Sequence, residues 1–232
     1  MAVESIINPQ HPEGLTDAQE NLSAQLFDIG AIKFGAFKLK LYDVRPEAPL
    51  SPIYIDLRIL RRFPQAKLAA VDAYQELASN LKFDLLADIP TAATPLVASL
   101  SDRLGIGMIT PRMDPKGHGT GAKIDGFLDS DKGKVVLLMD DLVTKADSKL
   151  EAAQVLIQNG LIVNDVVVLV DREQGGREEL AEKSLKLHAA MTMTKMLDFY
   201  ARIGRINANE RASIGKQLQG LNEFLTSLRQ QQ

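Results

Sequence analysis

Residues 135–144 read VVLLMDDLVT, and no other stretch of the chain says as much about its fold. Five consecutive apolar residues are typical of a strand that is buried on both faces, as in a parallel sheet. Asp140 and Asp141 follow where such a strand would emerge, and a helical pattern then runs from about Ser148 to Asn159. Because ligands bind at the carboxyl ends of strands in open α/β sheets, these two acids mark a candidate site.

Two adjacent acids at a strand end can also be solvated side chains without a function. Neighbouring side chains on a strand point to opposite faces, so Asp140 and Asp141 are not both expected in the core. Taken alone, the pair leaves both interpretations open.

The composition narrows the class of protein. The chain has 232 residues, of which 45% are hydrophobic and 25% charged, and its formal net charge is −3. This acidic balance, without a stripe of basic and aromatic residues, argues against nucleic-acid binding. The absence of cysteine excludes disulfides, thiol catalysis and cysteine-held zinc, and the three histidines are scattered. No apolar run approaches the roughly 20 residues that span a bilayer, and no signal pattern is present, so we expect a cytoplasmic protein without membrane association.

Strand and helix patterns alternate along most of the chain, which predicts β–α–β units and a parallel sheet with right-handed crossovers. Thr16 and Gln19 fit a capping box at the start of the first helix. We interpret residues 1–14 as a flexible leader and residues 15–232 as a single domain. The expected helices cover residues 16–28, 63–81, 94–104, 148–159, 176–183, 194–201 and 209–228. The expected strands cover residues 31–41, 51–58, 83–89, 108–110, the run from 135, a run ending at 171, and 185–190. We expect a turn or bulge at Gly35 within the first of these strands.

Residues 111–121 have no apolar periodicity. They contain three glycines, two prolines and the cation-capable side chains of Arg112, Lys116 and His118. This composition predicts a mobile loop or an extended hairpin.

Four segments taken together resemble the orotate phosphoribosyltransferases, including the transferase half of the bifunctional UMP synthases. Residues 27–35 (FDIGAIKFG) and 51–58 (SPIYIDLR) are similar to the N-terminal hood of that family, and residues 170–176 (VDREQGG) to its distal substrate loop. Asp140 and Asp141 lie where the family has its motif for phosphoribosyl pyrophosphate (PRPP). The resemblance extends from about residue 22 to the C-terminus. It implies a type I phosphoribosyltransferase-like α/β fold, with a central parallel sheet flanked by helices and a small N-terminal hood.

The resemblance also implies a reaction. The family transfers ribose 5-phosphate from PRPP to N1 of orotate with Mg²⁺, releasing pyrophosphate, in the biosynthesis of UMP. By similarity, Asp140 and Asp141 hold the ribose hydroxyls near the developing positive charge, and Lys116 of the mobile loop is catalytic at the departing pyrophosphate. No protein ligand of a metal is implied. The implied substrate-binding residues are Lys40, Tyr54, Arg112, His118, Thr144, Lys145, Asp147, Ser148 and Arg172.

The same resemblance implies partners. The family is homodimeric, because the mobile loop reaches into the site of the neighbouring subunit. Association with orotidine 5′-phosphate decarboxylase is a further expectation, since the two activities are fused in UMP synthases.

The donor side of the sequence departs from the family pattern. Ala146 replaces a glycine of the phosphate loop, and Asp147 places a carboxylate at the start of the following helix. We expect Ala146 to resist a positive φ and Asp147 to repel a phosphate. Met113 stands where a second basic residue is usual, residues 88–95 lack a tyrosine and a basic residue, and residues 41–50 replace a much shorter turn. These departures leave an alternative function open: a weakened or inactive paralogue that acts as a pyrimidine- or nucleotide-binding protein or as a regulatory protein.

Several of the implied site residues have a purely structural interpretation as well. Arg172 could form a surface ion pair with neighbouring acids, which contributes little stability. Thr144 could cap the helix that follows it. Lys40, Lys116 and His118 could be solvated side chains.

Overall fold

The computed structural model describes residues 14–113 and 123–229, and this part of the chain forms two compact units. One unit is Pro64–Thr192, and the other combines Met1–Phe63 with Met193–Gln232. The leader expected over residues 1–14 lies, apart from Gly14, outside the described residues. The single domain expected over residues 15–232 stays a prediction. No helix among the described residues is long and apolar enough to cross a bilayer.

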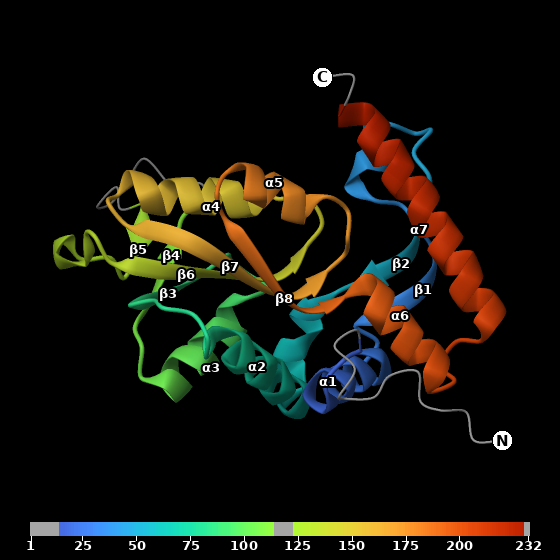
Figure 1. The fold of residues 1–232 in the computed structure, drawn as a ribbon, viewed down its shortest axis with the longest axis horizontal. Helices are drawn as coiled ribbons and strands as arrows, with labels where there is room; N and C mark the ends of the chain where they lie inside the picture. The colour runs from blue at the N-terminus through green and yellow to red at the C-terminus, as the bar shows by residue number, and fades with distance from the viewer. Residues whose placement is uncertain (1–13, 114–122, 230–232) are drawn as a thin grey trace. The chain divides into compact units, whose positions relative to one another are not determined.

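A six-stranded sheet forms the centre of the unit Pro64–Thr192 (Figure 1). Its strands are β3 (Leu85–Asp88), β4 (Met108–Pro111), β5 (Ile124–Asp125), β6 (Val135–Val143), β7 (Ile162–Asp171) and β8 (Lys186–Thr192). They lie in the order β5-β4-β3-β6-β7-β8, and neighbours run parallel except for β4 and β5. The predicted parallel sheet is confirmed, with β6 inside it as its apolar sequence requires.

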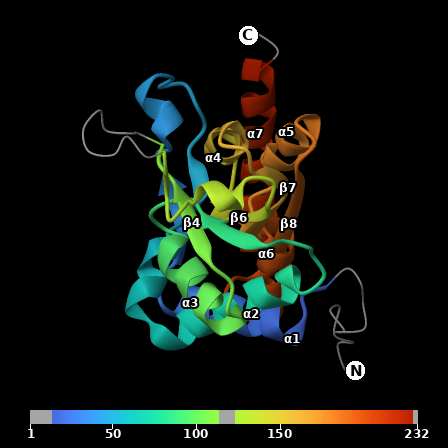
Figure 2. The same cartoon turned by 90° about the vertical axis from the view of Figure 1, so that its left-hand side faces the viewer.

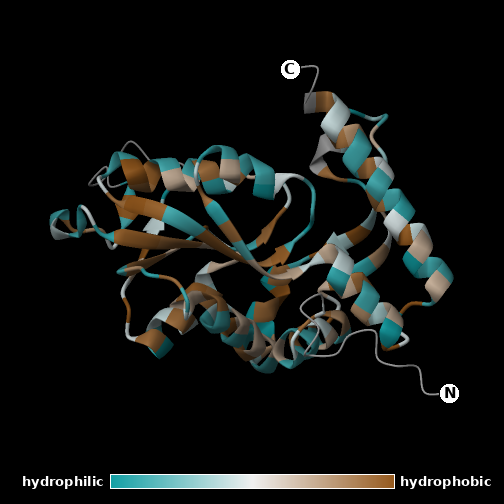
Figure 3. Cartoon of the chain, viewed as in Figure 1, coloured by the Kyte–Doolittle hydropathy of each residue, from teal (hydrophilic) through white to brown (hydrophobic). Residues whose placement is uncertain are grey.

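Helices cover both faces of this sheet. The helices α2 (Pro64–Ala78) and α3 (Thr94–Leu104) lie on one face, and α4 (Asp147–Gln158) and α5 (Gly176–Glu182) lie on the other (Figures 1 and 2). Strands that are apolar on both sides need such a cover. In Figure 3, much of the sheet is coloured brown for hydrophobic residues, and the helices on its two faces carry both hydrophobic and hydrophilic residues.

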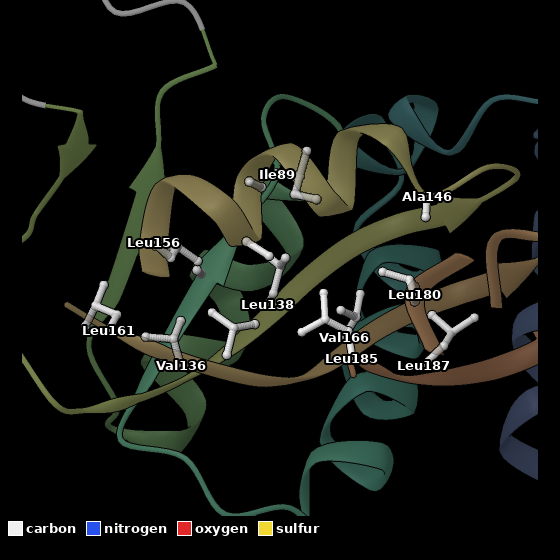
Figure 4. Packing of buried hydrophobic residues seen from close by; sticks show 14 of the residues in the cluster. Ile89, Val136, Leu138, Ala146, Leu156, Leu161, Val166, Leu180, Leu185 and Leu187 are labelled. Atoms are coloured by element: carbon white, nitrogen blue, oxygen red, sulfur yellow. The ribbon is translucent and has the colours of Figure 1, made fainter. Parts of the chain in front are cut away.

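The core between the sheet and the pair α4 and α5 holds the strand end in place. Leu138 of β6, Leu156 of α4 and Leu180 of α5 have no exposed surface and belong to one apolar cluster (Figure 4). Leu137 and Met139, which alternate with Leu138, are equally buried and point to the opposite layer. The carboxylates that follow on β6 are therefore carried by a strand that is fixed on both faces.

The other unit contains α1 (Asp17–Asp28), β1 (Ile32–Phe37), β2 (Ser51–Ile55), α6 (Met193–Arg202) and α7 (Ala208–Arg229). The predicted capping box of α1 is confirmed: Thr16 Oγ1 accepts from the Gln19 N–H at 3.3 Å, and Gln19 Oε1 accepts from the Thr16 N–H at 3.0 Å. The buried Tyr200 of α6 donates its hydroxyl to the Ser23 carbonyl at 2.9 Å and packs against Phe27. These contacts join the N-terminal and C-terminal parts of this unit.

The antiparallel strands β1 and β2 are both shorter than predicted. β1 ends at Phe37 and is followed by a 3₁₀ helix, Lys40–Asp43, in place of the strand expected to residue 41. The pairing is irregular between Phe34 and Phe37, so the bulge predicted at Gly35 is confirmed.

The expected continuation of β2 to Arg58 is wrong. The strand ends at Ile55, and a 3₁₀ helix, Leu57–Arg62, begins two residues later. The reason is local, because the Asp56 carboxylate accepts from the Arg58 N–H at 3.2 Å and caps the new helix.

Replacing Leu138 by Ala tests the packing that fixes β6. We expect a loss of about 2–5 kcal/mol in the free energy of unfolding, measured by urea denaturation, because the truncation leaves a cavity in the cluster. The control is Leu128→Ala, at a residue that is 65% exposed, where the change should be within about 0.5 kcal/mol. Equal effects of the two substitutions would show that the apolar cluster does not hold the strand.

Candidate active site

The paired acids lie at the end of β6 and differ in their surroundings. Asp140 is buried, and its Oδ2 lies 2.5 Å from the Nζ atom of Lys149, a buried lysine in the first turn of α4. Its Oδ1 accepts from the backbone N–H of Asp141 at 2.9 Å. Asp140 is thus held by a cation of the next helix.

Asp141 is half-buried, and its Oδ1 accepts from the Leu142 N–H at 2.8 Å. Burial and the nearby Asp140 charge raise its pKa to about 7, and the Lys149 charge opposes this rise. Asp141 therefore changes its charge near neutral pH, where a carboxylate at its ordinary pKa would already be ionised.

Tyr74 of α2 supports the strand end from the other face of the sheet. It is fully buried, and its hydroxyl donates to the Asp140 carbonyl at 2.7 Å. Burial raises the pKa of this hydroxyl well above its usual range, so it remains a donor at neutral pH.

The loop between β6 and α4, residues 144–146, turns without strain. Ala146 has φ −87° and ψ −1°, which is ordinary right-handed helical backbone. The expected difficulty at Ala146 is therefore wrong, because this turn requires no positive φ. Ala146 is also the N-cap of α4, so the structural interpretation of Thr144 as the helix cap is wrong too.

The carboxylate that accepts a hydrogen bond at the start of α4 comes from another helix. Glu179 of α5 accepts from the Ala146 N–H through its Oε2 at 2.7 Å. Asp147, the residue predicted to place its charge there, is the first residue of α4 and is exposed. The acid that competes for this N–H is Glu179, which the sequence reasoning missed.

The glycines of the distal loop allow it to approach the β6–α4 loop. The Gly176 N–H donates to the Thr144 carbonyl at 3.0 Å, and the Arg172 N–H donates to the Val143 carbonyl at 3.0 Å. A Cβ atom at Gly176 would collide with the Val143 side chain and lie 2.9 Å from the Thr144 carbonyl oxygen. Only glycine fits here, so the two segments that the sequence singled out lie side by side.

No protein-family model matches the chain. It is 36% identical over 197 residues to an orotate phosphoribosyltransferase of Caenorhabditis elegans, covering 84% of this chain and 79% of that protein. The chain belongs to the orotate phosphoribosyltransferase family.

Other relatives are longer. The chain is 36% identical over 198 residues to the bifunctional enzyme PyrF/PyrE of a Nostoc species, covering 85% of this chain but 39% of that enzyme. Among solved structures, the UMP synthase of Leishmania donovani has a TM-score of 0.76 and 30% sequence identity, covering 88% of this chain and 42% of that one. The chain thus spans about two fifths of these two proteins. The structural likeness bears out the type I phosphoribosyltransferase-like α/β fold.

The predicted residues of the family's substrate sites are distributed over both units. Asp140, Asp141, Thr144, Lys145, Asp147, Ser148 and Arg172 all lie in Pro64–Thr192, on β6, the β6–α4 loop, the start of α4 and the end of β7. Lys40 and Tyr54 lie in the other unit, where the half-exposed Tyr54 accepts a hydrogen bond from Arg58 at 3.3 Å. The Lys40 side chain, Lys116 and His118 lie outside what the structure describes.

Arg112 and Arg172 differ in their surroundings. Arg112 is exposed and pairs with Asp125 at 2.5 Å across β4 and β5. Arg172 is half-buried, and burial lowers the pKa of its guanidinium. The Asp171 carboxylate is bound by Arg177 at 3.1 Å, so the acid beside Arg172 has a different arginine as its described ion-pair partner.

Sequence reasoning missed the residues that brace these loops. Arg177 also donates to the Leu187 carbonyl at 2.9 Å, which fixes the distal loop to β8. The buried Asp88, at the end of β3, accepts from the hydroxyls of Thr94 and Thr110. An acid at the end of an apolar strand was the available signal for Asp88.

No group of three or more carboxylate or histidine side chains that could hold a metal ion occurs among the residues the structure describes.

Asp141→Asn tests the electrostatics of the site through stability. The folded-state pKa of Asp141 lies above its ordinary value of 3.8, so the folded protein binds more protons and this group destabilises it as pH rises from about 4 to about 7. Asparagine resembles the protonated acid. At pH 8 we expect the free energy of unfolding of the variant to be about 2 kcal/mol higher than that of the wild type. This difference should vanish near pH 4.

Urea titrations at several pH values measure this difference. The matched control is Asp129→Asn, at an exposed acid that pairs with Lys132, which lowers its pKa. Because the pKa of Asp129 is lowered, its ionised form stabilises the folded protein, so any loss in the free energy of unfolding of Asp129→Asn should appear at high pH. A wild-type advantage over Asp141→Asn at pH 8 would contradict the raised pKa.

Proposed function

We propose that the protein is an orotate phosphoribosyltransferase that acts in UMP biosynthesis. It transfers ribose 5-phosphate from PRPP to N1 of orotate, giving orotidine 5′-phosphate and pyrophosphate. Mg²⁺ enters with the donor, bound to the oxygens of PRPP. The observation that carries this proposal is the acid pair at the end of β6, followed directly by a loop that opens onto the N-terminus of α4. It occurs in a chain that belongs to the corresponding family.

The acid pair supplies the negative charge that the transfer needs. As pyrophosphate leaves C1 of the ribose, positive charge develops on the sugar, and fixed carboxylates stabilise it best if they are placed in advance. Asp140 is fixed by Lys149, and Asp141 has carboxylate capacity left for a ribose hydroxyl. Because Asp141 must be ionised for this role, activity should rise through about pH 7.

The β6–α4 loop receives the 5′-phosphate in this proposal. Backbone N–H groups at the start of a helix bind anions, and the helix dipole favours them. Thr144 and Ser148 add hydroxyl groups, and Lys145 adds a cation. The Glu179 carboxylate has to release the Ala146 N–H when the phosphate arrives.

The acceptor side uses the remaining predicted residues. The Arg172 guanidinium pairs with the orotate carboxylate, which suits its planar fork of donors. Lys40 and Tyr54 close over the base. Arg112, Lys116 and His118 reach in from the neighbouring subunit and neutralise the departing pyrophosphate. The proposal includes a cytoplasmic homodimer and association with orotidine 5′-phosphate decarboxylase. The bifunctional enzyme and the UMP synthase among the relatives, each more than twice as long as this chain, support that association.

The alternative function loses most of its basis. A weakened or inactive paralogue was considered because of Ala146 and Asp147. Ala146 adopts ordinary backbone angles, and the chain belongs to the orotate phosphoribosyltransferase family. Asp147 keeps an exposed carboxylate in the first turn of α4. Glu179 still places a negative charge there, and its effect can be measured directly.

A transfer assay tests the proposed function. Orotate consumption is followed in the presence of Mg²⁺ and PRPP for the wild type, Asp141→Asn and Asp129→Asn. We expect wild-type turnover and a loss of about 10²–10³-fold in kcat/KM for Asp141→Asn, since one preorganised charge is removed. Asp129→Asn, at an exposed acid on η3 (Asp129–Asp131), should match the wild type. Absence of wild-type turnover with saturating donor would reject the proposal.

Glu179→Gln tests how the phosphate reaches the loop. Removing one negative charge beside the Ala146 N–H should tighten PRPP binding by about tenfold, measured by calorimetry with Mg²⁺. The control is Glu178→Gln, because Glu178 is exposed in the same turn of α5. Equal affinities of all three proteins would mean that the 5′-phosphate does not use the Ala146 N–H.

A further inference from the structure

Lys149 is an unusual lysine because it is buried. Its side chain is 6% exposed, although lysine is almost never fully buried unless it is paired. Its Nζ atom lies 2.5 Å from Asp140 Oδ2 and 3.3 Å from Ser148 Oγ. One cation in the first turn of α4 therefore touches both an acid of β6 and a hydroxyl of the segment that follows the β6–α4 loop.

We propose that Lys149 is a positioning residue for phosphoribosyl transfer: it holds Asp140 against α4 and sets the charge that Asp141 presents to the ribose. This inference rests on the proposed function. Lys149 touches no substrate in this role and acts through the two carboxylates.

The charged and titratable groups around Asp141 come from three elements. Asp140 neighbours it on β6, Lys149 faces the pair from α4, and the Tyr74 hydroxyl approaches from α2. Burial and Asp140 raise the pKa of Asp141, and Lys149 and the Leu142 N–H lower it. Since Tyr74 is uncharged at neutral pH, Lys149 is the cation that keeps part of the Asp141 population ionised.

The geometry also explains why a lysine is needed at this position. Without its ammonium group, the Asp140 carboxylate would remain buried with only the Asp141 N–H as its described donor. Asp140 and Asp141 would then repel each other, and one of them would take up a proton. A protonated acid cannot stabilise positive charge on the ribose.

The experiment compares Lys149→Met, Lys149→Arg and the control Lys132→Met. Lys132 forms an exposed pair with Asp129 at 2.8 Å, so the control removes a lysine of the same kind of pair at the surface. The first readout is the titration of the Asp141 carboxyl in the unliganded protein by ¹³C NMR, assigned with Asp141→Asn. The second is the pH profile of kcat/KM for PRPP.

Lys149→Met should move the Asp141 titration and the acid limb of the kcat/KM profile to higher pH by about one unit. Lys149→Arg should restore both toward the wild type, and Lys132→Met should leave both unchanged. A folded Lys149→Met protein with an unshifted Asp141 titration would overturn the proposal, because a merely structural lysine would not move it.

If Lys149→Met does not fold, the double variant Asp140→Asn/Lys149→Met replaces it, since it leaves no buried charge unpaired. Its reference is the single variant Asp140→Asn, relative to which the loss of the Lys149 charge should move the Asp141 titration to higher pH. Equal titrations of the two variants, or a shift to lower pH, would overturn the proposal. The NMR titration needs no turnover, so an inactive wild type rejects the proposed function while the Asp141 titration still decides the role of Lys149.

Discussion

The buried ion pair between Lys149 and Asp140 is the constraint on which the site depends. Both side chains are almost completely removed from water, and a buried charge that loses its partner destabilises a protein by about 3–5 kcal/mol. The pair joins the end of β6 to the first turn of α4. Because the strand and the helix are fixed to each other, the loop between them is held at both ends. The Gly176 contact with Thr144 and the Glu179 contact with Ala146 then hold that loop from α5.

Most of the sheet could be predicted from the sequence, because its signals are local. Val136 to Met139 are apolar on both faces, which requires a central strand with a layer on each side. Thr16 and Gln19 mark the start of α1 by their own side chains. The strand β2 shows the limit of this reasoning. Its pattern continues to Arg58, but the Asp56 side chain caps a 3₁₀ helix and ends the strand at Ile55.

The candidate site was predictable as a list of residues and much less as a set of contacts. Asp140, Asp141 and Arg172 follow buried strands, which a single sequence can reveal. Lys149 looks like an ordinary helix residue, and Glu179 is one of two adjacent acids on α5; neither has a local pattern that predicts its partner. Ala146 illustrates the opposite error. A family pattern suggested strain, yet the helical backbone angles at this residue accept any side chain.

Above all, we propose that the end of β6 and the β6–α4 loop together hold the ribose 5-phosphate of the donor. A crystal structure of the protein with PRPP and Mg²⁺ measures this directly. We expect the ribose hydroxyls within hydrogen-bond distance of the Asp141 carboxylate, the 5′-phosphate on the N–H groups of the loop and the Glu179 side chain displaced from Ala146. Donor density elsewhere, with Glu179 still on the Ala146 N–H, would contradict it.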